Sequence, residues 1–150
     1  MSYFDSSKNK TNEDFKRNRE LQSKVENLME VEPEVALVSL GDMNGRLKRL
    51  EPNIPTDANG KMLEEWTTRL DMHHLNLTDQ CIGKYTFKSK NGRSAIDHIL
   101  VNDWLFEKYI GMYIDEDRMQ LDISDHCVVR AWFKLDITKE KTYWKNNKIK

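Results

Sequence analysis

An apolar run that stops at a glycine and continues into two polar residues constrains this sequence more than any other feature. The run begins at Val35 and ends at Gly41, and Asp42 and Asn44 follow two positions apart. A short apolar run between Pro33 and a glycine is typical of a strand buried on both faces, although periodicity alone does not exclude a buried helix. Since residues two apart in an extended chain point the same way, we expect both polar side chains where the strand emerges into a cleft.

The same segment has a simpler interpretation. Glycine, aspartate and asparagine all favour turns, so the residues also fit a plain turn after a strand. On this stretch alone, the turn and the functional site are interpretations of equal weight. The choice depends on the polar residues that the other predicted strands carry at their ends.

The composition predicts a soluble chain of one-domain size. It has 150 residues, of which 38% are hydrophobic and 33% charged, and this length is enough to bury a core. The formal net charge of −1 gives no overall field toward nucleic acid, so any phosphate-binding surface must be local. No apolar run approaches a membrane span, and the N-terminus has no apolar signal-peptide core. Cys81 and Cys127 are isolated, which favours reduced thiols and an intracellular protein, nuclear or cytoplasmic.

The hydrophobic pattern predicts one α/β domain over residues 11–137, between a disordered segment at 1–10 and a basic tail at 138–150. Thr11 and Asp14 resemble a weak capping box at the start of a first helix. Trp66 lies on the apolar face of a second helix, where a core position is the better interpretation. The predicted elements are a helix from 11 to just before Pro33, a strand at 35–40, a helix around 62–70, short strands at 75–77 and 110–114, hairpin strands at 85–88 and 94–101 around Asn91-Gly92, a helical turn at 103–109 and a last strand at 127–135.

Adjacent histidines at 73 and 74 are expected at a helix end or on the surface, because neighbouring histidines rarely bind one metal together. A zinc site formed by His73, His74, Cys81 and Cys127 is an alternative that lacks any usual zinc spacing.

Five polar residues stand at the ends of the predicted strands: Asp42, Asn44, Asp97, Asp125 and His126. A carboxylate inside an apolar strand needs a partner, so Asp97 is expected to orient His126 and leave its other ring nitrogen for acid–base or phosphate-binding work. Asp125 offers a hard oxygen to Mg²⁺, which needs only one or two protein carboxylates. Asp42 can align or deprotonate a water, and Asn44 can donate to a phosphate oxygen. Together these residues predict metal-assisted hydrolysis of a phosphate ester.

Three motifs follow one another in the chain: Leu40-Gly41-Asp42-Met43-Asn44, Ser94-Ala95-Ile96-Asp97-His98-Ile99-Leu100 and Ser124-Asp125-His126. Their order resembles the Gly-Asp-Phe-Asn, Ser-x-Ile-Asp-Tyr-Ile and Ser-Asp-His motifs of the endonuclease/exonuclease/phosphatase superfamily, with Met43 in place of the aromatic residue. This superfamily includes apurinic endonucleases and the endonuclease domains of non-LTR retrotransposons. Other segments are similar to the retrotransposon branch in particular: Asn59-Gly60-Lys61-Met62-Leu63, Thr86-Phe87 and Asn91-Gly92.

The resemblance implies a Mg²⁺- or Mn²⁺-dependent DNA endonuclease. The lack of a membrane-length apolar run predicts that the chain has no membrane partner. It implies that Asp42 aligns or activates the attacking water and that Asn44 contacts the scissile phosphate. It further implies that Asp97 orients His126, which stabilises the phosphate or acts as the base. By the same resemblance, Asp125 is expected to help hold the metal.

The resemblance also implies a fold, a four-layer α/β/β/α sandwich of which this chain matches the C-terminal half. The family's first half carries an asparagine and a metal-binding glutamate at strand ends, and no glutamate in residues 1–34 has such a place. Half of a two-sheet sandwich exposes the inner face of its sheet. We therefore expect an incomplete metal site and either self-association or docking with a missing N-terminal half.

Two other functions stay open. Within the same enzyme class, the substrate can be a small phosphate ester, which makes the protein a phosphatase. In a different class, the chain is an inactive, truncated remnant of a mobile element or an interaction module. The absent glutamate favours this second class, and the retained polar residues at the strand ends argue against it.

Overall fold

The computed structural model describes residues 5–31, 35–117 and 124–135. The elements in these ranges are α1 (Asp5–Val31), β1 (Val38–Asp42), α2 (Ala58–Arg69), β2 (His73–His74), the 3₁₀ turn η1 (Leu75–Leu77), β3 (Cys81–Ile82), β4 (Phe87–Ser89), β5 (Gly92–Ser94), β6 (Asp97–Val101), α3 (Asp103–Phe106), β7 (Tyr109–Ile114) and β8 (Val129–Phe133). Mixed helix and sheet content confirms the predicted α/β class.

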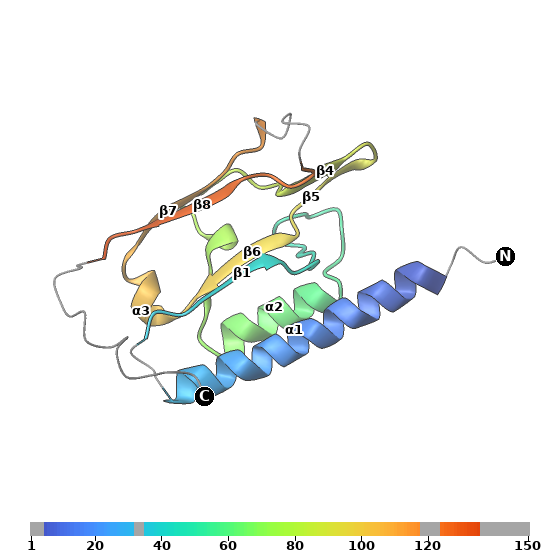
Figure 1. Cartoon of the computed structure of the whole chain (residues 1–150). Helices are drawn as coiled ribbons and strands as arrows, with labels where there is room; N and C mark the ends of the chain where they lie inside the picture. Colours follow the sequence, from blue (N-terminus) through green and yellow to red (C-terminus); the bar gives the residue numbers. More distant parts are fainter. Residues whose placement is uncertain (1–4, 32–34, 118–123, 136–150) are drawn as a thin grey trace.

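The described elements form three layers (Figure 1). The first is a pair of helices, α1 and α2, which lie side by side. The second is an antiparallel sheet of order β1-β6-β2, and the third is a sheet of order β3-β7-β8, in which β3 runs parallel and β8 antiparallel to β7. The hairpin β4–β5 extends from one end of the sheets (Figure 1).

Strand β6 separates two hydrophobic clusters because its residues alternate between the two faces of its sheet. Leu100 faces the helices and packs in a cluster with Met62, Leu63 and Trp66 of α2. Val101 faces the other way and packs in the cluster that includes β7. Trp66 is fully buried, which confirms its predicted core position.

Strand β1 is an edge strand, and the prediction that it is buried on both faces is wrong. Its only strand partner among the described residues is β6. Ser39 faces the helices and is buried, whereas Val38 and Leu40 are 40% and 67% exposed. They share the face of Val101 and Ile99 in the register, so the second sheet covers that face over β6 but leaves it open over β1.

Helix α1 begins before the predicted start. It runs from Asp5, so Thr11 lies inside the helix and is no N-cap, and residues 5–10 are helical where disorder was predicted. Residues 1–4 lie outside the described residues, as does the predicted basic tail. Buried Val25 anchors α1 to the first cluster, and Arg19 Nη1 lies 2.7 Å from Glu65 Oε2 on α2.

The segment after α2 differs from the prediction in two places. The residues at 75–77 form a 3₁₀ turn, and the short strand is His73–His74, which pairs with the end of β6. The predicted strand at 94–101 is divided into β5 and β6 by Ala95 and Ile96. Side-chain oxygens hold the amides at this break: the Ala95 N–H donates to Glu51 Oε1 at 3.1 Å, and the Ile96 N–H donates to Thr86 Oγ1 at 3.0 Å.

The hairpin, the helical turn α3, and strands β7 and β8 are confirmed near their predicted places. In the described part of the chain, no helix has the length and apolar character that crossing a bilayer requires.

Candidate active site

Two carboxylates face each other where β1 and β6 pair. Asp42 and Asp97 are direct cross-strand partners, so their side chains leave the same face of the sheet. The next residue, Met43, donates its N–H to Ile96 O at 3.1 Å, which makes the aspartate pair a non-hydrogen-bonded pair with closely spaced side chains. Like charges at such positions repel, so this end of the sheet favours a cationic partner.

His126 lies against one of these carboxylates. Its Nδ1 is 2.9 Å from Asp97 Oδ2 and 3.1 Å from Oδ1, and the side chains of His126 and Asp97 are 35% and 19% exposed. Because a carboxylate oxygen accepts hydrogen bonds, Nδ1 carries the hydrogen and donates a hydrogen bond to Asp97. This leaves Nε2 for another partner. The structure thus brings together the two residues that the sequence analysis paired. Their catalytic roles stay predictions.

Thr86 holds the backbone of Asp97 and that of Cys127, the residue after His126. Its Oγ1 accepts from the Asp97 N–H at 2.9 Å, and its carbonyl accepts from the Cys127 N–H at 2.7 Å. Thr86 is fully buried. The sequence analysis placed Thr86 only in a strand-like run similar to the retrotransposon branch. Its contacts to two distant segments were not predictable, because they leave no pattern in the neighbouring residues.

The Ser-Asp-His segment has a local reason for its composition. The His126 N–H donates to Ser124 Oγ at 3.1 Å, a short turn closed by a hydroxyl. The ring of Phe87 meets the His126 ring edge-on, with centroids 5.2 Å apart. Asp125 is exposed, and its carbonyl accepts from the Lys88 N–H at 2.9 Å. The hairpin therefore fixes this segment next to the site.

Asn44 does not continue the strand, and the argument from an extended chain is wrong for it. Strand β1 ends at Asp42, and Asn44 has a φ of +48°, a left-handed conformation that asparagine tolerates better than most residues. The Asn44 N–H donates to Asp42 Oδ1 at 3.1 Å. The interpretation as a turn is therefore confirmed, and this turn fixes the Asp42 carboxylate. The interpretation as a functional site stays a prediction.

The carboxylates provide a partial fit to a divalent cation. Within the described residues, no three histidine, cysteine, aspartate or glutamate side chains gather closely enough to hold a metal ion. Mg²⁺ retains several waters and is usually bound through one or two carboxylates together with substrate phosphate. Asp125, exposed beside His126, suits one such ligand position.

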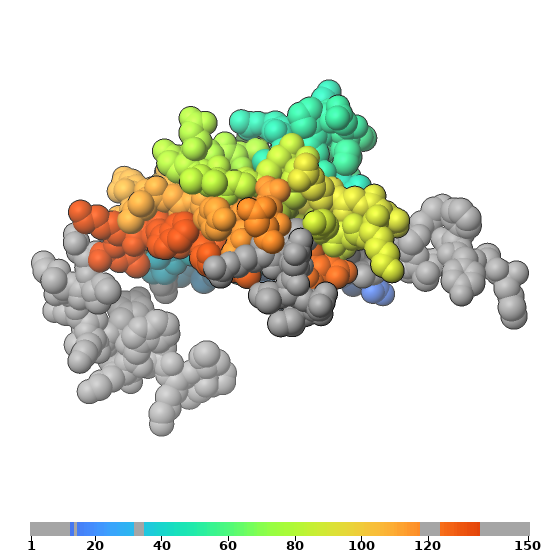
Figure 2. Space-filling model, turned by 90° about the horizontal axis from the view of Figure 1, so that it is seen from above, coloured from blue at the N-terminus to red at the C-terminus, as the bar shows by residue number. Residues whose placement is uncertain are grey.

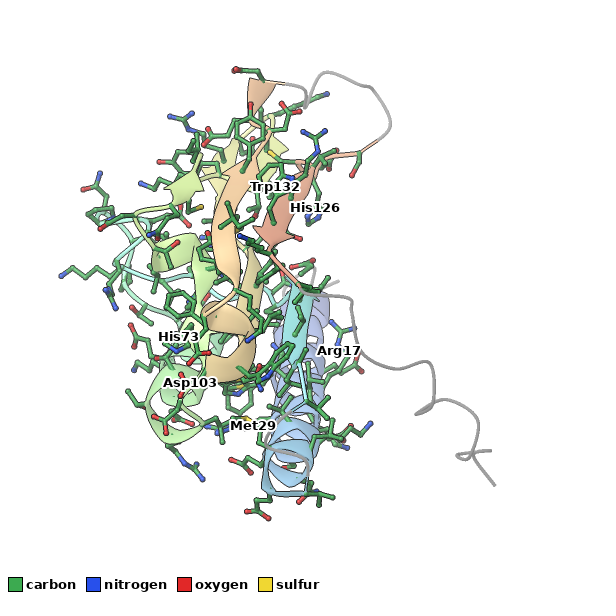
Figure 3. The ribbon with its side chains drawn as sticks, turned by 90° about the vertical axis from the view of Figure 1, so that its left-hand side faces the viewer. Arg17, Met29, His73, Asp103, His126 and Trp132 are labelled. Carbon is green, nitrogen blue, oxygen red and sulfur yellow. The ribbon has the colours of Figure 1, made fainter. Side chains whose placement is uncertain are left out.

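The four residues of the alternative zinc site, His73, His74, Cys81 and Cys127, do not form a metal-binding cluster in the described part of the chain. His73 Nε2 is 2.5 Å from Asp103 Oδ1, and both lie away from His126 (Figure 3). His74 is buried, so a surface or helix-end position is wrong for it. Burial raises the pKa of the Cys81 thiol, and burial also raises that of Cys127 to about 11; both cysteines are free thiols.

A basic surface lies next to the site. The segment at 84–94, which includes the β4–β5 hairpin, has no acidic residue and carries Lys84, Lys88, Lys90 and Arg93. Figures 1 and 2 show the hairpin, in yellow, extending beyond the sheets at one end of the molecule. Arg93 Nη1 lies 3.7 Å from Glu116 Oε2, so the three lysines give this segment its local positive charge.

The comparisons with known proteins agree with the motifs. A family model described as endonuclease-reverse transcriptase matches residues 3–130. No curated protein matches the chain significantly. The matched range includes all five predicted site residues: Asp42, Asn44, Asp97, Asp125 and His126.

Proposed function

This chain belongs to the endonuclease-reverse transcriptase family, and we propose that it hydrolyses DNA phosphodiester bonds with the help of Mg²⁺ or Mn²⁺. The observation that carries the proposal is the contact of His126 Nδ1 with the Asp97 carboxylate at 2.9 Å, on the face that Asp42 shares. A histidine fixed in this way beside two carboxylates is suited to phosphate chemistry.

His126 acts through Nε2, the nitrogen that Asp97 leaves available. Asp97 sets the tautomer and the ring orientation, and Phe87 limits the ring's rotation by packing against it. Nε2 then either stabilises the charge that develops on the phosphate or takes the proton of the attacking water.

Asp42 and Asn44 act from the other strand. The hydrogen bond from the Asn44 N–H holds Asp42 Oδ1 in one orientation, and a carboxylate so held aligns or deprotonates a water. The Asn44 side chain belongs to the same turn and contacts the scissile phosphate, where an amide N–H stabilises the developing negative charge.

Asp125 contributes one ligand to the divalent cation, whose chemistry is to neutralise phosphate charge and polarise the ester. The backbone carbonyl of Asp125 accepts from the Lys88 N–H, and the neighbouring His126 contacts Asp97, so the backbone that carries this carboxylate is fixed on both sides. Water and substrate oxygens would supply further ligands.

The basic hairpin favours DNA over a small phosphate ester. Lys88 and Lys90 are exposed on it, and an extended positive surface is useful for a polymeric phosphate backbone but unnecessary for a single phosphate group. The interaction module stays the alternative if the folded chain has no hydrolytic activity.

The test is a nicking assay on supercoiled plasmid with Mg²⁺ or Mn²⁺, with a small phosphomonoester as a second substrate. We expect plasmid nicking that His126→Gln and Asp125→Asn each reduce by about a hundredfold or more. The matched controls are His73→Gln and Asp103→Asn, a histidine and an aspartate at the other end of β6.

Preserved nicking in His126→Gln contradicts the assigned role. Hydrolysis of the monoester with no plasmid nicking favours the phosphatase. A folded chain that cleaves neither substrate contradicts the proposed activity and favours the interaction module.

A further inference from the structure

Three successive carbonyls of the turn after β1 are each held by a buried side chain from a different element. Asn18 Nδ2 of α1 donates to Met43 O at 3.0 Å, and Asn59 Nδ2 of α2 donates to Asn44 O at 3.3 Å. His98 Nε2 of β6 lies 2.7 Å from Gly45 O. The three donor residues are only 5%, 4% and 0% exposed. We call Asn18, Asn59 and His98 the carbonyl cradle.

The cradle's histidine has a defined protonation state. A carbonyl only accepts, so His98 Nε2 carries a proton, and His98 Nδ1 accepts from His74 Nε2 at 3.0 Å. Burial lowers the pKa of His98 and holds the pKa of His74 well below its ordinary value. The charged groups that face the pair are Asp42, Asp57 and Asp97 around His98 and Arg49 around His74. The pair is therefore a neutral, oriented donor chain that ends on the turn.

The first turn of α2 closes the cradle from the other side. Asp57 Oδ1 accepts from the Arg46 N–H at 3.1 Å and from the Gly60 N–H at 2.7 Å. A Cβ on Gly60 would lie 2.1 Å from Arg46 O, so only glycine permits this approach of helix and turn.

This arrangement exceeds what a plain surface turn needs. Carbonyls of an exposed turn bond to water at no structural cost, whereas these carbonyls point inward to donors from three elements. The same turn holds Asn44 in a left-handed conformation and leaves Asp42 exposed. A strained residue persists where its surroundings over-determine it, and this is common at functional sites.

We propose that the carbonyl cradle positions Asp42 and Asn44 for phosphodiester hydrolysis, with His98 as its central positioning residue. The effect on hydrolysis rests on the proposed function. The effect on the geometry of the turn rests on the hydrogen bonds alone. None of the cradle residues needs to touch the substrate.

The test compares His98→Leu with His98→Gln, since glutamine places an N–H donor near the position of Nε2 and leucine removes it. We expect His98→Leu to lower kcat for plasmid nicking by about 10–100-fold, the effect of misplacing reacting groups by about an ångström. KM should stay near the wild-type value because the basic hairpin is unchanged, and His98→Gln should recover most of the rate.

A second readout separates this proposal from the proposed activity. Amide hydrogen exchange at Asn44, whose N–H bonds to Asp42 Oδ1, should be faster in His98→Leu and close to wild type in His98→Gln, while the amide of Leu100 in β6 is unchanged. This readout applies even if the wild type does not nick DNA, so failure of the activity and failure of the cradle are distinguishable.

If His98→Leu does not fold, Asn59→Ala carries the same two measurements, because Asp57 and not Asn59 caps α2. Its matched control is Asn53→Ala, an exposed asparagine of the same connecting segment. The proposal is overturned if amide hydrogen exchange at Asn44 is unchanged in these variants. It is also overturned if this exchange is faster in a variant whose kcat is unchanged. A rise in KM with kcat unchanged overturns it as well, because that result assigns the residues to substrate binding.

Discussion

At the scale of single residues, two histidines near the start of β6 have opposite environments. His126 is partly exposed, and its Nδ1 contacts the Asp97 carboxylate. His98 is fully buried between a carbonyl and another histidine, an environment suited to the neutral form only. We therefore assign proton chemistry to His126 as a prediction, whereas His98 has a fixed position in the interior.

The buried pair predicts how stability depends on pH. Burial lowers the pKa of both His74 and His98 from the ordinary value of 6.5, so the unfolded chain binds protons that the folded chain does not. The contribution of this pair to the free energy of unfolding is thus fully present above pH 6.5 and is lost on acidification below it. The loss is at most about 1.4 kcal/mol per pH unit for each histidine.

Urea unfolding at a series of pH values from neutral to mildly acidic measures this slope. His74→Gln removes one of the two protons that the chain takes up on unfolding. We therefore expect the free energy of unfolding to depend less steeply on pH in this variant over the same range. A free energy of unfolding that stays constant on acidification would show that the pair is not held neutral in the folded protein.

At the scale of elements, the candidate site is assembled from ends. The end of β1 supplies Asp42, the start of β6 supplies Asp97, and the segment before β8 supplies Asp125 and His126. Strand pairing fixes these ends in space, and the polar residues themselves lie where pairing stops. Loop positions on a rigid scaffold combine exposure with precise placement, which catalysis requires.

The β4–β5 hairpin predicts a salt-dependent contribution to DNA binding. The double variant Lys88→Gln with Lys90→Gln should weaken duplex binding about equally for different sequences. It should also reduce the slope of log affinity against log salt by about 0.9 for each phosphate that the hairpin no longer neutralises.

Fluorescence anisotropy without divalent cations measures this binding in the absence of cleavage. The matched control, Lys24→Gln with Lys61→Gln, removes two exposed lysines from the helices α1 and α2. Equal effects of the two double variants would contradict a specific role of the hairpin.

At the scale of the whole molecule, the described chain has a covered face and an open one. Helices α1 and α2 cover one side of the first sheet, and the second sheet covers the other side over β6. The β1 edge remains open, with Leu40 67% exposed. Trp132, on the outward face of β8, is 48% exposed. An edge strand with apolar side chains and unpaired backbone groups is a template for further strand pairing.

We therefore expect the chain to associate with itself as concentration rises, and Leu40→Lys to reduce this association by placing a charge on the edge. Sedimentation velocity over a range of concentrations measures it. The matched control is Leu28→Lys, because Leu28 is a comparably exposed leucine (54%) on α1. Monomeric wild type at every concentration, or equal effects of the two variants, would contradict pairing at the β1 edge.

Much of this organisation follows from local sequence. The apolar periodicity places α1, α2, β7 and β8, and the three ordered motifs identify the polar residues at the strand ends, because both are properties of neighbouring residues. The pairing of Asp97 with His126 was also accessible, since a carboxylate in an apolar strand needs a partner.

Tertiary structure alone decided the rest, because it depends on contacts between residues far apart in the chain. No periodicity distinguishes β1 as an edge strand or places His74 in the interior. Thr86 reaches Asp97 and Cys127, and His98 reaches Gly45. Hydrogen bonds across such separations form only after packing brings the elements together. The residues predicted to carry the chemistry are therefore readable in the sequence, and those that hold them in place are not.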